Sequence, residues 1–180
     1  MNLLIFTRVE GLLRQPASGR CEVSREALDA VIAARVPLVL VSDAAAADVQ
    51  EIQRELGLLE PFICRGGGEL HVPVSYFSDR DASSEDSGWE RFSFNTSSPA
   101  AAMRLLGALF IAQGHAKMLT VGLGCGCSDG AMLTAVDIPI VVRDHSHDQS
   151  TLLEHVPGAY LTTASGPAGW LEAVVGPQLT

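Results

Sequence analysis

Cysteine and histidine occur as two closely spaced pairs in a pattern that suits metal binding. Cys125 and Cys127 lie in a glycine-rich turn after one short apolar run, and His145 and His147 follow the next apolar run. If both runs are parallel strands, the two pairs lie on the same rim of a sheet. Two thiolates and two imidazoles suit tetrahedral Zn²⁺. The spacings CxC and HxH are not usual for structural zinc, so the alternative of small turn residues and solvated histidines stays open.

The opening of the chain places charged residues after a strand candidate. It reads NLLIFTRVEGLL, an apolar run that breaks at Thr7 and turns at Gly11. Such a run is typical of a buried strand. The opening resembles the hhhhTDxDGTLL motif of the haloacid dehalogenase (HAD) phosphatases, in which the first Asp attacks phosphorus and the second is the general acid. Arg8 and Glu10 occupy those two positions.

Further segments resemble one branch of that family, the mannosyl-3-phosphoglycerate phosphatases. Ser42 in VLVSDAAAADV matches the phosphate-binding hydroxyl, and Arg65 in PFICRGGG replaces the Glu of PFIxENGG. The segment GLGCGCSDGAMLTAVDIPIVVR resembles GLGDSxNDxxMLxxVDIPxVVR, with Cys125 in place of an acidic residue and Asp129 retained. Pro99 lies where the branch has its lysine, and GPAGWLEAV resembles the closing GPxGWxEAV.

The resemblance implies a magnesium phosphatase whose site is altered in this chain. The family holds Mg²⁺ with the nucleophilic Asp, a backbone carbonyl and the acidic residue of the fourth loop. Arg8 has only donors and a permanent charge, and a divalent ion 4 Å away would be repelled by about 8 kcal/mol at an effective dielectric near 20. Loss of a covalent nucleophile costs roughly 10⁴ to 10⁶ in turnover. We therefore expect no Mg²⁺, no other cofactor and no intact catalytic set. The family positions concerned are Arg8, Glu10, Ser42, Pro99, Cys125 and Asp129.

Arg8 allows two interpretations. In the first, Arg8 replaces the charge of the metal and binds a phosphate or carboxylate together with Ser42, Arg65 and the start of the helix after the fourth strand. In the second, Arg8 pairs with Glu10 or Asp129 and closes the site. The sequence leaves both open.

The pattern of the chain predicts an α/β fold. With 180 residues and 47% hydrophobic content, one domain over residues 1–180 is expected. Strand-like runs alternate with helical segments, which indicates a mostly parallel sheet covered by helices, a HAD-like, Rossmann-like three-layer sandwich. Residues 69–98 fall where relatives insert a cap domain and suffice only for a reduced cap or hairpin. Strands are expected at Leu3–Phe6, Leu38–Val41, Phe62–Cys64, Met118–Val121 and Ile138–Val142. Helices are expected at 24–35, 43–56, about 99–113 and from near Pro167, with Ser24 and Asp43 as N-caps.

Charge and hydropathy exclude some classes. A net charge of -9 disfavours nonspecific nucleic-acid binding. No apolar run reaches membrane-spanning length, and the first one lacks the basic flank of a signal peptide, so a soluble, cytoplasmic protein is expected. The polar run Asp79–Gly88 indicates an exposed loop.

These observations favour a catalytically inactive relative of the phosphatases with a ligand-binding, scaffolding or regulatory role. A small anionic ligand, a protein partner or a homo-oligomer would fit that role. The competing hypothesis is a hydrolase acting on a phosphorylated sugar or glycerate, using Glu10 or Asp129 with an unusual metal. Fold alone does not decide between them.

Overall fold

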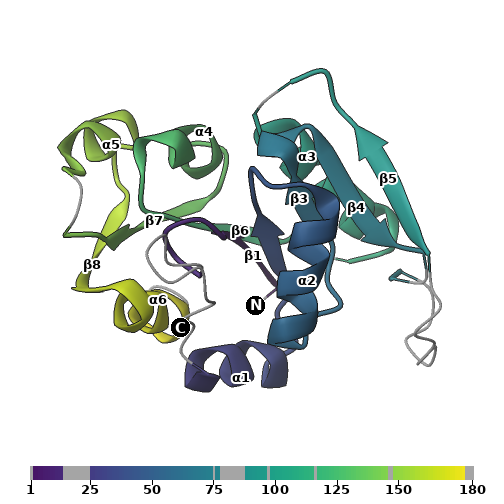
Figure 1. Ribbon diagram of the computed structural model, residues 1–180, viewed down its shortest axis with the longest axis horizontal. Coiled ribbons are helices and arrows are strands. Elements are labelled where there is room, and N and C mark those ends of the chain that lie inside the picture. The colour runs from purple at the N-terminus through teal and green to yellow at the C-terminus, as the bar shows by residue number, and fades with distance from the viewer. Residues whose placement is uncertain are drawn as a thin grey trace. The chain divides into compact units, whose positions relative to one another are not determined.

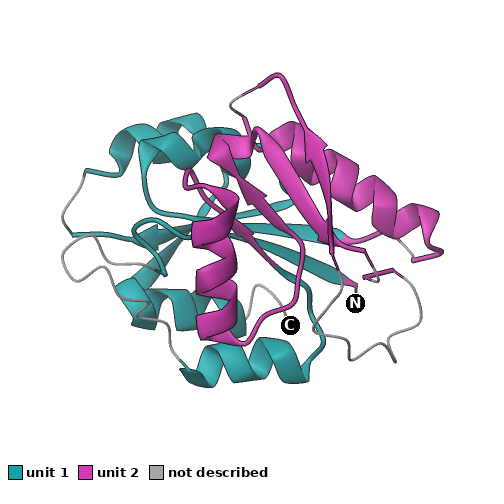
Figure 2. Ribbon diagram, turned by 45° about the vertical axis from the view of Figure 1, so that its right-hand side comes forward, with its two compact units in different colours: residues 1, 3–38, 119–180 teal, residues 2, 39–118 magenta. Residues whose placement is uncertain are grey.

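The structure is a computed structural model that describes residues 2–13, 25–74, 76–77, 88–96, 98–115, 117–145 and 148–176. The chain forms two compact units, unit 1 with residues 3–38 and 119–180 and unit 2 with residues 39–118 (Figure 2). Ser24, His147 and all but the last residue of the polar run 79–88 lie outside the described residues.

Unit 1 is built on parallel strands. Ile5 pairs with Val121, Val121 with Ile138, and Ile140 with Tyr160, which gives the order β1-β6-β7-β8. Every residue of β1 is buried, as expected for a parallel strand with helices on both faces. The strands are β1 (Leu3–Arg8), β6 (Leu119–Gly124), β7 (Ile138–Arg143) and β8 (Tyr160–Ser165).

Helices cover both faces of the unit 1 strands. Figure 1 shows α4 and α5 on one side and α1 and α6 on the other. Trp170 on α6 is fully buried, and its indole Nε1 donates to Thr7 Oγ1 on β1 at 3.1 Å. This contact ties α6 to the strand that ends at Arg8. The helices are α1 (Arg25–Ala33), the 3₁₀ turn η2 (Cys127–Asp129), α4 (Gly130–Leu133), α5 (Ser150–His155) and α6 (Gly166–Val175).

Unit 2 combines parallel and antiparallel strands. Strand β2 runs parallel to β3, β4 is antiparallel to β3, and β5 is antiparallel to β4. In Figure 1, α2 lies in front of these strands and α3 behind them. The elements are β2 (Leu38–Val41), α2 (Ala46–Leu56), β3 (Phe62–Cys64), the 3₁₀ turn η1 (Arg65–Gly67), β4 (Glu69–Pro73), β5 (Trp89–Ser93) and α3 (Ala100–Ala112).

The predicted α/β class with mostly parallel strands is confirmed. Strands β2 and β3 have the expected bounds, whereas β1, β6 and β7 extend beyond the expected C-terminal ends. Strand β8 and helix α5 were not predicted. The prediction that Asp43 caps α2 is wrong, because the N-cap is Ala45, in extended conformation and without a side-chain hydrogen bond.

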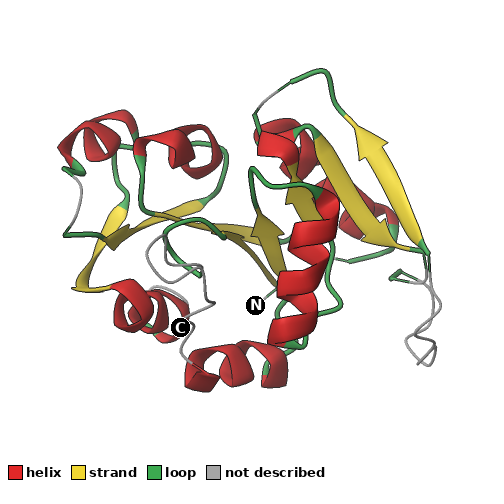
Figure 3. Cartoon of the chain, in the orientation of Figure 1, coloured by secondary structure: helices red, strands yellow, loops and turns green. Residues whose placement is uncertain are grey.

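Residues 69–98, expected to form a reduced cap or hairpin, contain β4 and β5, which pair with each other and continue the sheet of unit 2 from β3 (Figure 3). A cap function for this pair stays a prediction. Among the described helices, none has both the length and the apolar character needed to cross a membrane.

Candidate functional site

Arg8, the last residue of β1, is buried between two carboxylates. Its side chain is only 6% exposed. Arg8 Nε lies 2.9 Å from Asp129 Oδ1, and Arg8 Nη2 lies 3.3 Å from Glu10 Oε2. The geometry is the one expected from the second interpretation of Arg8, with both carboxylates as partners instead of one. A guanidinium with two carboxylates leaves a local net charge of minus one.

Asp129 is held in place by the turn that follows β6. Its Oδ2 accepts hydrogen bonds from the backbone N–H groups of Cys125 at 2.8 Å and Gly126 at 3.0 Å. Its Oδ1, besides facing Arg8, accepts a bond from Ser128 Oγ at 3.3 Å. A Cβ at Gly124 would lie 2.7 Å from the Cβ of Asp129, so glycine there permits this close approach. Both oxygens of Asp129 are therefore occupied by groups of the protein.

Cys125, which the resemblance aligns with an acidic metal ligand, is a buried thiol. Burial, and then the carboxylates of Asp129 and Asp144, raise the pKa of Cys125 to about 12, although Arg8 opposes the shift. A Cβ at Gly11, whose φ is 79°, would come within 2.8 Å of the Cys125 sulfur. The thiol therefore fills the space beside the loop that carries Glu10. Sulfur is also a softer donor than the oxygen ligands that Mg²⁺ prefers.

Gln149 was missed by the sequence analysis. Its Nε2 donates to the carbonyl oxygens of Cys125 at 2.7 Å and Val142 at 2.9 Å, and its Oε1 accepts the N–H of Asp144 at 3.1 Å. One amide thus links the loops after β6 and β7. No local motif signals this role, because it depends on which strands are neighbours.

The residues proposed as zinc ligands differ in their burial. Cys125 is buried, while Cys127 and His145 are exposed. Among the residues that the structure describes, these three side chains do not converge as a metal-ligand group. His147 lies outside the described residues, so the four-residue site stays a prediction.

Ser42 and Arg65 belong to unit 2. Ser42 is buried, and its Oγ accepts the N–H of Ala44 at 3.0 Å. The Arg65 side chain is 61% exposed, and its Nε lies 3.2 Å from Glu69 Oε1. Pro99 is the N-cap of α3, and it brings no cation to the position where the branch has lysine. The predicted anion site of Arg8, Ser42 and Arg65 stays a prediction.

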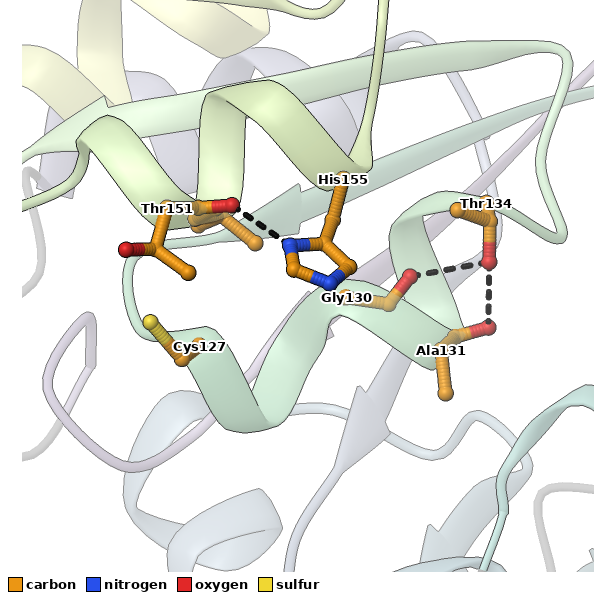
Figure 4. Close-up of a pocket in the computed structure, with 7 residues that line it drawn as sticks. Cys127, Gly130, Ala131, Thr134, Thr151 and His155 are labelled. Carbon is orange, nitrogen blue, oxygen red and sulfur yellow. Dashed lines mark hydrogen bonds between the residues drawn. The ribbon is translucent and has the colours of Figure 1, made fainter.

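A separate cavity of about 400 Å³ lies between α4 and α5 in unit 1. Figure 4 shows the His155 ring between the two helices, with Cys127 lining the same space. His155 Nδ1 lies 2.7 Å from the carbonyl oxygen of Thr151. Because a carbonyl only accepts, Nδ1 carries the proton of the neutral ring. The lining residues are Cys127, Gly130, Ala131, Thr134, Thr151, Leu152 and His155.

Part of the chain is similar in sequence to a known phosphatase. No family model matches the chain. The glucosyl-3-phosphoglycerate/mannosyl-3-phosphoglycerate phosphatase of Persephonella marina is 31% identical over 74 residues, which are 41% of this chain and 28% of that protein. The match thus spans less than a third of the relative's length.

Two solved structures resemble the chain over nearly its whole length. A structure from work on the trigonal-bipyramidal intermediate of a phosphoryl-transfer superfamily has a TM-score of 0.67 at 12% identity, covering 96% of this chain and 97% of that one. A HAD superfamily phosphatase from Bacteroides thetaiotaomicron has a TM-score of 0.63 at 12% identity, covering 90% of each chain. The chain therefore has the fold of these HAD structures, and part of it is similar in sequence to a sugar-phosphoglycerate phosphatase.

Proposed function

We propose that this protein is a HAD-fold pseudophosphatase whose role is binding or regulation without phosphoryl transfer. The observation that carries the proposal is the ion-paired Arg8 at the position of the family's nucleophile, 2.9 Å from Asp129. An arginine has no lone pair available to attack phosphorus and stays protonated throughout the physiological range.

The other positions of the site support the same proposal. Mg²⁺ prefers oxygen ligands in octahedral geometry. The site offers a guanidinium and a protonated thiol where the family has carboxylates, and Asp129 is committed to Arg8 and to two backbone N–H groups. These residues do not fit Mg²⁺.

An anion that binds Arg8 would have to displace the carboxylate of Glu10. Asp129 is only 3% exposed at its side chain and held by several donors, whereas Glu10 is 41% exposed and lies farther from Arg8. A phosphate or carboxylate approaching from solvent would therefore displace Glu10 and keep Asp129. We infer that a small anion, if bound here, replaces the Glu10 carboxylate on Arg8.

The test is a phosphatase assay on a broad panel of phosphate esters with Mg²⁺, Mn²⁺ or Zn²⁺, together with isothermal titration of phosphate and glycerate. We expect turnover at background for the unmodified protein. We also expect anion binding to strengthen in Glu10→Gln, because the competing carboxylate is gone.

The control variants are Glu10→Gln and Asp129→Asn, assayed side by side with the unmodified protein. Turnover that persists in both variants indicates a contaminating phosphatase. Turnover in the unmodified protein that disappears in either variant would overturn the proposal and establish a hydrolase with a rewired site.

A further inference from the structure

Three potential metal ligands meet on the antiparallel pair β3–β4 of unit 2. Cys64, the last residue of β3, pairs in register with Glu69, the first residue of β4. His71 follows Glu69 by two positions, so both side chains lie on the same face of β4. The potential ligand atoms of Cys64, Glu69 and His71 all lie within 4.8 Å of one another.

The two distances from Glu69 are near those of a metal-bound set. Cys64 Sγ lies 3.7 Å from Glu69 Oε2, and His71 Nε2 lies 3.0 Å from the same oxygen. In a tetrahedral zinc site with bonds of about 2.3 Å to sulfur and about 2.1 Å to nitrogen or oxygen, neighbouring ligand atoms are separated by roughly 3.4 to 3.6 Å. Shifts of a few tenths of an ångström would bring Glu69 Oε2 to that separation from both other atoms. The sulfur and the imidazole nitrogen lie within 4.8 Å of each other, close enough for one ion to draw them together.

The surroundings hold the three side chains in this arrangement. Cys64 is fully buried and His71 is 7% exposed. The His71 ring stacks on Phe62, with ring centroids 4.8 Å apart and planes 4° apart, which fixes its orientation. A preformed site of this kind loses little side-chain entropy on binding an ion.

We propose that Cys64, Glu69 and His71 bind one zinc ion that clasps β3 to β4. Thiolate, imidazole and carboxylate are the donors zinc accepts, and the presence of sulfur disfavours Mg²⁺ and Ca²⁺. On binding, the Cys64 thiol releases its proton to solvent. His71 Nε2 gives up the proton it shares with Glu69 Oε2, so that Nδ1 carries the proton of the neutral ring. Water takes the fourth position. Arg65, whose Nε contacts Glu69 Oε1 from a largely exposed side chain, can turn into solvent. The site shares no residue with the ion-paired cluster of Arg8, Glu10 and Asp129 (the Arg8 cluster), and it does not depend on the pseudophosphatase proposal.

The experiment is a metal titration of protein purified without a histidine tag and stripped with chelator. Zn²⁺ is added to one sample and Co²⁺ to another, because Co²⁺ reports thiolate ligation through a charge-transfer absorption. We expect one equivalent of Zn²⁺ per chain, the cobalt–thiolate band, and a higher Tm with metal than with chelator.

Variants assign the binding to these residues. Cys64→Ser and His71→Gln should each weaken Zn²⁺ binding at least about tenfold and remove or shift the cobalt spectrum. Cys127→Ser serves as the matched control, because this thiol is exposed and lies in unit 1; it should bind as the unmodified protein does. If Cys64→Ser fails to fold, Glu69→Gln takes its place. This variant keeps the buried thiol and changes a partly exposed position, and it should also weaken Zn²⁺ binding.

Three results would overturn the proposal. The first is absence of stoichiometric Zn²⁺ binding by the folded, unmodified protein. The second is binding that survives in folded His71→Gln and Glu69→Gln. The third is loss of binding in Cys127→Ser, which would place the metal elsewhere.

Discussion

At the scale of single residues, the cluster of Arg8, Glu10 and Asp129 shows how one buried charge constrains its neighbours. Arg8 places a positive charge beside Asp129. The two groups now compensate each other at 2.9 Å in a buried setting. Burying either charge alone would be costly, so each makes the other necessary.

Removing Arg8 should therefore destabilise the protein far more than removing its exposed partner. Arg8→Met is expected to lower the free energy of unfolding by about 3 to 5 kcal/mol, because Asp129 is left as a buried, uncompensated charge. Glu10→Gln, at a 41% exposed side chain, should cost only about 0 to 1 kcal/mol. Urea denaturation of both variants at pH 7 measures the two costs. Equal costs would contradict the view that the buried pair Arg8–Asp129 dominates the cluster.

The cysteines should differ sharply in reactivity. Burial and Glu69 raise the pKa of Cys64 to about 12, and burial and Asp129 raise that of Cys125 to about 12, whereas Cys127 is exposed. At pH 8 a thiol of pKa 12 is thiolate in only about one molecule in 10⁴, and thiolate is the reactive form. In chelator-treated, native protein we expect Cys127 to be alkylated at least about tenfold faster than Cys64 or Cys125. Peptide mapping by mass spectrometry after iodoacetamide resolves the individual sites, and Cys125 labelling as fast as Cys127 would contradict the prediction.

At the scale of elements, Glu172 on α6 fastens the helix to the preceding strand. Its carboxylate accepts the N–H groups of Thr163 at 2.8 Å and Ala164 at 2.8 Å, and the hydroxyl of Tyr160 at 2.6 Å. These bonds, with that from Ala164 the largest, lower the pKa of Glu172 below its usual 4.5. The same helix carries Trp170, which reaches Thr7 next to Arg8.

The sign of this shift sets a pH dependence. A lowered pKa in the folded state means that Glu172 contributes stability above pH 4.5 and loses it as the pH falls through the folded-state value. Glu172→Ala should lower the free energy of unfolding at pH 7 by about 1 to 3 kcal/mol, and the difference from the unmodified protein should shrink below pH 4.5. Urea denaturation at pH 7, 5 and 3.5 tests this. A difference that is constant across the series would contradict the assigned role.

Elements with a clear apolar pattern were predictable, and the others were not. Strands β2 and β3 are short, fully buried apolar runs, and their bounds were predicted correctly. In β8 the residue that is fully buried is Thr162, so the segment YLTTAS presents no apolar run. Helix α5 has six residues, too few for a helical period to stand out. Asp43 looked like an N-cap by residue type, but α2 begins three residues later.

At the scale of the whole chain, the Arg8 cluster was predictable and the zinc-ligand set was not. Glu10 and Asp129 are more than 100 residues apart in sequence, yet one of the two interpretations of Arg8 paired it with Glu10 or Asp129. That inference was possible because β1 and β6 are parallel neighbours that end at the same edge. The set of Cys64, Glu69 and His71 depends on the antiparallel register of β3 and β4. Sequence spacing alone does not reveal that register, so the sequence analysis did not group these three residues.

The side chains of Arg8 and Cys125 alone should account for the expected absence of Mg²⁺ binding. The double variant Arg8→Asp, Cys125→Asp would place two carboxylates beside Glu10 and Asp129. Without a cation these like charges repel, so the variant should unfold at a lower temperature than the unmodified protein. With Mg²⁺ the oxygen-rich site should gain stability as RT ln(1 + [Mg²⁺]/Kd), about 2.7 kcal/mol at a hundred times Kd.

Differential scanning calorimetry with and without Mg²⁺ measures this gain, and Arg8→Asn, Cys125→Asn is the uncharged, isosteric control. We expect a Tm increase on adding Mg²⁺ in the Asp variant and none in the Asn variant or the unmodified protein. An equal increase in all three would mean that Mg²⁺ acts elsewhere on the molecule. An increase confined to the Asp variant would mean that the backbone of the loops after β1 and β6 still has the geometry of a metal site, and that Arg8 and Cys125 are what keep the ion out.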